Sequence, residues 1–261
     1  MTAASAACCA VFSASGWQSL VVANCAQLKT LVGLSVTTLQ PTDVTVSQLP
    51  QLRSLRALSP LTAVQGALTI DGNGALPTLD GLPNLGAVGD CVIARNAALR
   101  NLSALSAGTR CQRSLRLDGN AALVSLAGAG ALIGDGASLY VGGSPLLRQL
   151  APLPQLTRVA DLSLVDLPLL AAVDTIAQRL TTVTGALTLA GLPRITDLSA
   201  FQPINATVGA LHLRRMTALA SLAGSGGFAS HLATLEIDGC PLLTSVAPLG
   251  SPTIGAVVLR N

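Results

Sequence analysis

The chain has 261 residues, of which 50% are hydrophobic, 10% charged and 2% aromatic, with a formal net charge of +3. No run of about 18 consecutive apolar residues occurs, which argues against insertion of this segment into a membrane. Lys29 is the single lysine and the arginines are scattered along the sequence, so neither a nucleic-acid surface nor an anionic-membrane surface is indicated.

The N-terminal stretch carries no charged residue before Lys29. Residues 6–15 are apolar and then small, which is faintly similar to a secretory signal, but the positive segment that should precede such a signal is missing. We therefore expect residues 1–16 to form an N-terminal cap or a weak signal-like segment. Residues 17–261 are expected to form one solenoid domain.

A motif of about 24 residues recurs along nearly all of the chain, and its clearest copy runs over 68–88. Each copy opens with an apolar residue, and another follows two positions later, which is typical of a short strand with one buried face. Aliphatic residues stand eight and eleven positions after the opening residue in all ten complete copies. The opening residues are Leu20, Val44, Leu68, Cys91, Leu115, Leu139, Leu162, Leu187, Leu211, Leu235 and Val257.

A repeat this short cannot bury its apolar side chains alone and must stack on copies of itself. The sequence therefore predicts a mainly β solenoid of about ten repeats of 22–25 residues, with one long parallel sheet. The opposite side, rich in Gly, Pro and Ala, is expected to hold irregular turns, 3₁₀ segments or a second short strand. Since the sequence ends within an eleventh strand, we expect further repeats, a stalk or an anchor to follow.

Three successive copies carry an asparagine five positions after the opening residue: Asn73, Asn96 and Asn120. Their amides could form an internal ladder that bonds to loop backbone. Other copies have apolar residues in this place, so the ladder is expected to be local.

Six cysteines are present: Cys8, Cys9, Cys25, Cys91, Cys111 and Cys240. For Cys25, Cys91 and Cys240 the favoured interpretation is a buried free thiol acting as a small hydrophobic side chain. Cys91 and Cys111, near the starts of neighbouring repeats, are the first pair to test for a disulfide, and Cys8 or Cys9 could join Cys25 in a cap. A zinc site is disfavoured because only two histidines and no paired C-x-x-C spacing occur.

The segment 85–99 resembles a leucine-rich repeat, L-x-x-L-x-x-L-x-L-x-x-N-x-x-L. The segments 66–73 and 79–85 together resemble the receptor L-domain, the leucine-rich-repeat-like solenoid of growth-factor and insulin-type receptors. The resemblance covers roughly residues 17–261 and implies a right-handed coil, an extracellular setting, and recognition of protein or glycan on the sheet face. The Cys-rich modules of the animal receptors are absent from this sequence.

Two groups of polar residues fall at outward positions of the predicted sheet, among mostly small residues. Tyr and Arg are enriched at binding hot spots, so these are the candidate contacts, although charges paired across strands can also serve solubility alone. The first group is Arg116, Asp118 and Tyr140, and the second is His212, Arg214, Glu236, Asp238 and Arg260.

Asn101 and Asn205 each open an N-x-Ser/Thr triplet and are candidate glycosylation acceptors. The sequence contains no nucleophile elbow, phosphate loop, H-E-x-x-H or dinucleotide fingerprint. We expect no enzyme activity, no cofactor and no metal.

The sequence therefore predicts a non-enzymatic module of a cell-surface or secreted protein that binds a protein or glycan ligand. Two alternatives stay open: an intracellular, cytoplasmic leucine-rich-repeat scaffold for protein–protein interaction, and a structural spacer without a specific ligand.

Overall fold

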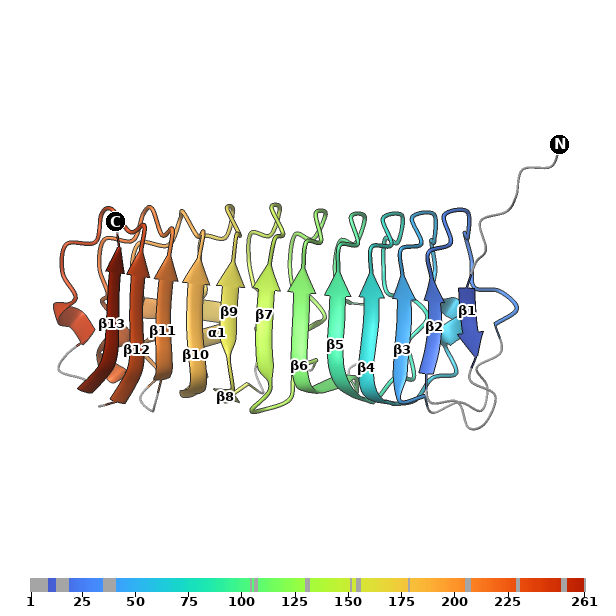
Figure 1. Cartoon of the computed structure of the whole chain (residues 1–261), viewed down its shortest axis with the longest axis horizontal. Coiled ribbons are helices and arrows are strands. Elements are labelled where there is room, and N and C mark those ends of the chain that lie inside the picture. Colours follow the sequence, from blue (N-terminus) through green and yellow to red (C-terminus); the bar gives the residue numbers. More distant parts are fainter. Residues whose placement is uncertain are drawn as a thin grey trace.

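The structure is a computed structural model, and it describes residues 9–12, 19–34, 41–103, 105, 108–129, 132–150, 152–153, 156–177, 179–204, 208–228, 231–249 and 253–260. These residues form one 13-stranded sheet that runs along the whole molecule (Figure 1). The strands are β1 (Cys9–Phe12), β2 (Ser19–Ala23), β3 (Asp43–Ser47), β4 (Val64–Asp71), β5 (Ala87–Ala94), β6 (Arg110–Asp118), β7 (Ser138–Gly142), β8 (Arg158–Val159), β9 (Leu162–Val165), β10 (Thr182–Ala190), β11 (Val208–Arg214), β12 (His231–Asp238) and β13 (Thr253–Arg260).

The chain winds as a β-solenoid of about nine turns, close to the predicted ten repeats. From β2 to β13 the strands of the main path pair in parallel, in chain order. The predicted opening residues pair with one another, as in Leu20 with Val44, Val44 with Leu68 and Leu68 with Cys91. The predicted register of the repeat is therefore confirmed. Below, one turn of the solenoid is called a coil.

The first coil is preceded by β1, which pairs with β2 in the antiparallel direction. Antiparallel pairing gives the outer edge of β2 its hydrogen-bond partners. The described part of the N-terminal segment therefore lies on the end of the sheet.

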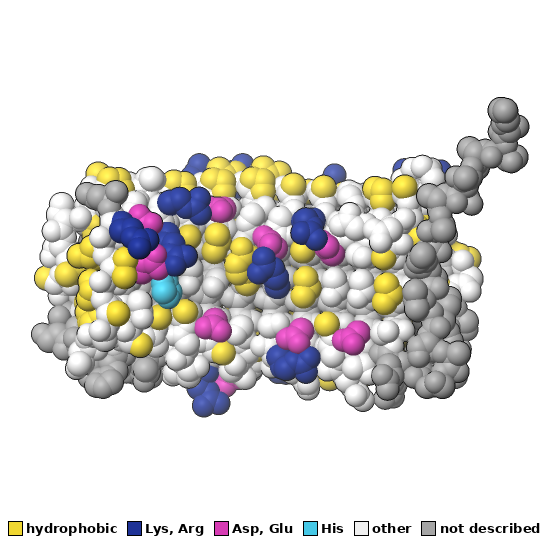
Figure 2. Space-filling model, viewed as in Figure 1, with side chains coloured by type: hydrophobic (Ala, Val, Ile, Leu, Met, Phe, Trp, Pro, Cys, Tyr) yellow, Lys and Arg dark blue, Asp and Glu magenta, His cyan; other side chains and the backbone are white. Residues whose placement is uncertain are grey.

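Burial alternates along the strands, because successive side chains of a strand point to opposite faces. In β2 and β3 the second and fourth residues are buried and their neighbours are partly exposed. The inward residues join the leucines of the turns in one continuous core that includes Leu52, Leu55 and Phe201. The outward residues form the sheet face, which Figure 2 shows from the front. In β13 the inward residues Val257 and Leu259 are exposed.

In the described residues, the helical segments on the side opposite the sheet are short, which agrees with the expected irregular turns and 3₁₀ segments. They are η1 (Arg56–Leu58), α1 (Asp174–Ala177), η3 (Ser199–Phe201), η4 (Ser225–Gly227) and η5 (Ala247–Leu249).

A column of polar residues recurs ten positions after the opening residue of the coil, in the turn that begins the side opposite the sheet. This turn is called the second turn below. In seven coils a side-chain oxygen ten positions after the opening residue accepts a hydrogen bond from the backbone N–H two residues later. Short polar side chains favour turns by this kind of local bond. The acceptors are Ser54, Thr78, Asn101, Ser125, Asp197, Ser221 and Ser245.

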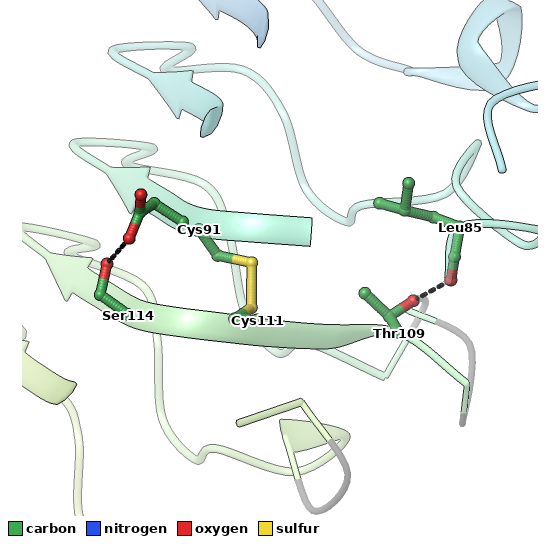
Figure 3. Close-up of a disulfide and its surroundings, with 6 residues drawn as sticks. Leu85, Cys91, Thr109, Cys111 and Ser114 are labelled. Atoms are coloured by element: carbon green, nitrogen blue, oxygen red, sulfur yellow. Dashed lines mark hydrogen bonds between the residues drawn. A yellow bond between two sulfur atoms is a disulfide. The ribbon is translucent and has the colours of Figure 1, made fainter. Parts of the chain in front are cut away.

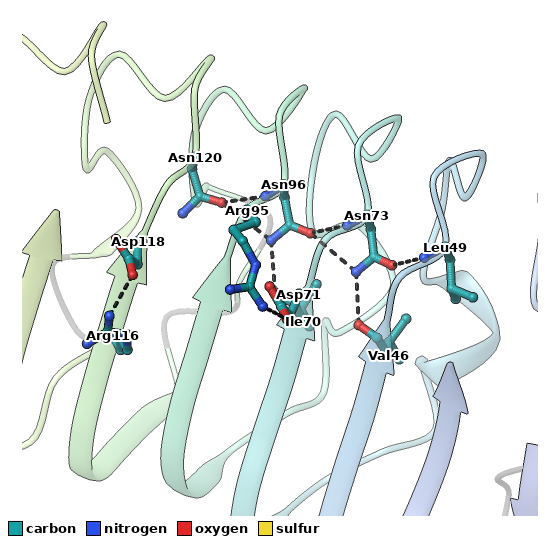
Figure 4. A network of polar contacts seen from close by, with 10 residues as sticks. All are labelled: Val46, Leu49, Ile70, Asp71, Asn73, Arg95, Asn96, Arg116, Asp118 and Asn120. Atoms are coloured by element: carbon teal, nitrogen blue, oxygen red, sulfur yellow. Dashed lines mark hydrogen bonds and ion pairs between the residues drawn. The ribbon is translucent and has the colours of Figure 1, made fainter. Parts of the chain in front are cut away.

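The predicted asparagine ladder is present below the loops that follow β4, β5 and β6 (Figure 4). All three asparagines are fully buried. The Asn96 amide nitrogen donates to the carbonyl of Ile70 at 2.8 Å, and the Asn96 Oδ1 accepts from the backbone N–H of Asn73 at 3.1 Å. Asn73 and Asn120 repeat both types of bond in the neighbouring coils. The amides thus satisfy backbone groups that the loops leave without partners inside the core.

The prediction that Cys25, Cys91 and Cys240 are buried free thiols agrees with the structure for one of the three. Cys91 and Cys111 form a disulfide between β5 and β6, with a Cα–Cα distance of 5.7 Å (Figure 3). Cys25 is also disulfide-bonded, whereas Cys240 is free and buried. The free-thiol interpretation is therefore wrong for Cys25 and Cys91. For Cys91 the reason is that its side chain faces that of Cys111 on the adjacent strand, close enough to bond. The interpretation is confirmed for Cys240. The Cys8 and Cys9 side chains lie outside the described residues.

We predict that Asn96→Ala lowers the free energy of unfolding by about 3 kcal/mol, because it leaves the Asn73 N–H and the Ile70 carbonyl buried without partners. Asn84→Ala is the matched control, since the Asn84 amide donates to the Ser59 carbonyl at the exposed surface. Its cost should stay within about 0.5 kcal/mol. Urea unfolding of the two variants measures the difference, and equal costs would contradict a structural role for the ladder.

Candidate functional site

The Tyr140 patch, defined as Arg116, Asp118 and Tyr140, spans β6 and β7 on the sheet face. Parallel pairing places Arg116 directly beside Tyr140. The guanidinium carbon of Arg116 lies 4.0 Å from the centre of the Tyr140 ring, a cation–π contact. The same guanidinium donates to the Asp118 carboxylate at 2.6 Å. The sequence-predicted members of this group are therefore in contact.

The Tyr140 ring lies along the strand because its neighbour two residues on has no side chain. A Cβ atom at Gly142 would stand only 2.6 Å from the Tyr140 hydroxyl oxygen, so only glycine leaves room for the ring. Burial raises the pKa of the Tyr140 phenol, and the nearby Asp118 carboxylate raises it further. The phenol thus stays protonated and keeps its O–H as a hydrogen-bond donor.

The Glu236 patch, defined as His212, Arg214, Glu236, Asp238 and Arg260, lies on β11, β12 and β13. Strand pairing sets His212 beside Glu236, and Arg214 beside Asp238. Strand pairing also sets Asp238 beside Arg260 of the next strand. Figure 2 shows the resulting cluster of basic, acidic and histidine side chains toward the C-terminal end of the sheet face.

Glu236 is the centre of this patch and accepts three contacts. Its Oε1 accepts from Arg214 Nε at 2.9 Å and its Oε2 from Arg214 Nη2 at 2.5 Å, a two-pronged pair. Its Oε2 also lies 2.9 Å from Nδ1 of His212. These bonds, the one from Arg214 first, lower the Glu236 pKa to about 2, although burial opposes the shift. The Glu236 side chain is 13% exposed, so the pair is mostly shielded from water.

Several ion pairs at the strand ends lie outside both predicted groups. Arg95, in the loop after β5, pairs with Asp71 of the preceding coil (Figure 4). Arg215 pairs with Asp166 at 3.0 Å, two coils away. Arg95 and Arg215 share one place in the repeat and a left-handed backbone, with φ of 52° at each. The repeat register alone could have suggested the Arg95–Asp71 pair, because the two residues stand at adjacent places of neighbouring copies.

Asn101, the first candidate glycosylation acceptor, belongs to the polar column of the second turn. Its Oδ1 accepts from the Ser103 N–H at 3.1 Å and from the Ser103 hydroxyl at 2.5 Å. The Asn101 side chain therefore has a structural partner, and its glycosylation stays a prediction. Asn205 lies outside the described residues.

Within the described residues, no group of three or more His, Cys, Asp or Glu side chains is placed to hold a metal ion. In the same part of the chain, no helix is long and apolar enough to cross a membrane. No protein-family model, no curated protein and no solved structure matches this chain.

We predict that Glu236 contributes an acid-labile component of stability. Its pKa in the folded protein, about 2, is below its ordinary value of 4.5, so the stabilisation is complete above pH 4.5 and disappears as the pH falls toward 2. Glu236→Gln should flatten the decline in unfolding free energy across this window, measured by denaturant unfolding at several pH values.

Asp166→Asn is the control, because the Asp166–Arg215 pair is exposed on both sides and contributes little. This variant should keep the wild-type slope. A wild-type slope in the Glu236 variant as well would contradict the role given to Glu236.

Proposed function

We propose that this chain is a non-enzymatic recognition module of a cell-surface or secreted protein, and that its sheet face binds a protein or a glycan. The observation that carries the proposal is the stacked pair of Arg116 and Tyr140 on the sheet face. Large side chains that are already fixed by neighbours lose little conformational freedom when a ligand binds them. The Arg116–Tyr140 pair is prepared for contact in this sense.

Only part of the Glu236 patch is accessible to a ligand. Glu236 is occupied by Arg214 and His212, so its charge is largely neutralised within the patch. Arg214, with 46% of its side chain exposed, and Arg260 at the outer strand are the groups that a ligand could reach. We therefore assign the main contact to the Tyr140 patch and a secondary contact to Arg214 and Arg260.

The extracellular setting is supported by the disulfides. Disulfides persist mainly in oxidising compartments and are rare in the cytosol. The Cys91–Cys111 bond joins two coils through the core, where both sulfur atoms are buried. A cytoplasmic scaffold would have to keep these facing thiols reduced.

We also propose that the solenoid is right-handed and of the leucine-rich-repeat type, related to the receptor L-domain. The aligned leucine columns and the asparagines beneath the loops support this relation.

The binding proposal is tested by screening the immobilised protein against arrays of extracellular domains and of glycans. We predict that Arg116→Ala and Tyr140→Ala each weaken binding of a true ligand by at least about tenfold, because truncation of a hot-spot residue costs about 2 kcal/mol or more. Ser163→Ala and Thr188→Ala, on the same face, are the controls and should bind normally. If the chain is a structural spacer, the screens find no ligand. A ligand whose affinity is unchanged by Tyr140→Ala would show that the Tyr140 patch is not its binding site.

The setting is tested on intact source cells with a membrane-impermeant reagent, followed by peptide mapping without reduction. We expect labelling before lysis and a Cys91–Cys111 peptide pair in the labelled protein. Labelling only after lysis, with both cysteines free, would instead support the intracellular scaffold.

A further inference from the structure

Basic residues that are scattered in the sequence line up in the fold. Lys29, Arg53, Arg100 and Arg148, here called the basic stripe, each stand nine positions after the opening residue of their coil. They lie in the turns that follow the strands, and this part of the surface is called the turn side of the solenoid. Figure 2 shows basic side chains recurring along the upper rim of the molecule, where the chain leaves the sheet.

Backbone hydrogen bonds between successive coils hold this column in line. The Arg53 N–H donates to the Lys29 carbonyl at 3.2 Å. The N–H of Arg100 donates to Pro77, that of Val124 to Arg100, and that of Arg148 to Val124. Four of the five steps from Lys29 to Arg148 are bonded in this way. The exception is the step from Arg53 to Pro77, because proline has no backbone N–H. The step along the column is about 4.8 Å per coil.

The stripe is exposed and its charges are not neutralised locally. All four side chains are exposed, and none takes part in an ion pair with another described residue. The turn segments of the first six coils (27–33, 51–57, 75–81, 98–103, 122–128 and 146–150) carry five basic residues, the fifth being Arg56, and one acid, Asp80. These six segments thus hold a net of four positive charges, compared with +3 for the whole chain.

We propose that the basic stripe binds a linear sulfated or carboxylated polysaccharide along the long axis of the solenoid. Arg53, Arg100 and Arg148 recur every second coil, roughly every 10 Å, and the stripe from Lys29 to Arg148 covers roughly 24 Å. An extended chain with anionic groups at regular intervals meets several cations at once. Guanidinium groups also pair with oxyanions through two parallel hydrogen bonds.

The same charge pattern could attract a nucleic acid, but two observations favour the polysaccharide. Proteins that bind single-stranded nucleic acid add aromatic side chains on which bases stack, and the six turn segments contain none. The Cys91–Cys111 disulfide favours an oxidising setting, where anionic glycans are abundant ligands. The proposal does not depend on the sheet face, because the stripe shares no residue with the Tyr140 patch or the Glu236 patch.

The test measures binding of a size-defined heparin oligosaccharide to the intact protein across a range of salt concentrations. The stripe variant is K29Q/R53Q/R100Q/R148Q. Its matched control is R95Q/R113Q/R158Q/R215Q, which removes the same charge from arginines that are each paired with an aspartate. Glutamine is tolerated at the left-handed positions of Arg95 and Arg215, since Gln48 occupies that place in its own coil with a φ of 54°.

We expect the stripe variant to bind the heparin oligosaccharide at least about tenfold more weakly at 0.1 M salt, with the slope of log affinity against log salt reduced by about three. The control should bind within about threefold of the wild type, since its removed cations are locally compensated. Desulfated heparin should bind the wild type at least about tenfold more weakly.

Equal losses in both variants would show that only net charge matters and would overturn the proposal. So would absence of heparin binding by the wild type, or tighter binding of single-stranded DNA of equal charge. If the fourfold variant fails to fold, the singles R100Q and R148Q replace it, each with an expected loss of about threefold against R113Q. Unchanged affinity in both singles would be equally decisive against the stripe.

Discussion

The structure depends on one constraint: each coil must match the next residue for residue. A coil of about 24 residues has no interior of its own, so its leucines become buried only where they meet the leucines of adjacent coils. Parallel backbone hydrogen bonds enforce this match along the sheet, and a second set does so along the turns. A one-residue slip would turn inward leucines toward water, which fixes the register strongly.

Because the register is fixed, residues that are far apart in the sequence become close neighbours at regular intervals. Arg116 meets Tyr140, Arg214 and His212 meet Glu236, and Lys29 aligns with Arg53 for the same reason. The solenoid therefore displays two kinds of surface. The sheet face holds compact groups whose members contact each other, while the turn side holds separated charges in a line.

The repeat made the strands, the leucine columns and the asparagine ladder predictable, because each depends on a side-chain type recurring at a fixed interval. The members of the Tyr140 and Glu236 patches could be assigned from the same register. The left-handed place in the loops was not predictable, since Gln48, Arg95 and Gly72 share it without chemical similarity. The basic stripe does not follow from the composition, because the number of lysines and arginines says nothing of their place in the coil.

The Cys91–Cys111 disulfide limits how the stack of coils can extend under tension. Under tension along its length, a solenoid can lose coils one after another from its ends, because each is held mainly by its neighbours. The bond closes a 20-residue segment in the interior of the stack, between β5 and β6. That segment cannot be drawn out while the bond is intact, which withholds roughly 70 Å of extended chain. The covalent link thus shortens the maximum length to which the protein can be stretched.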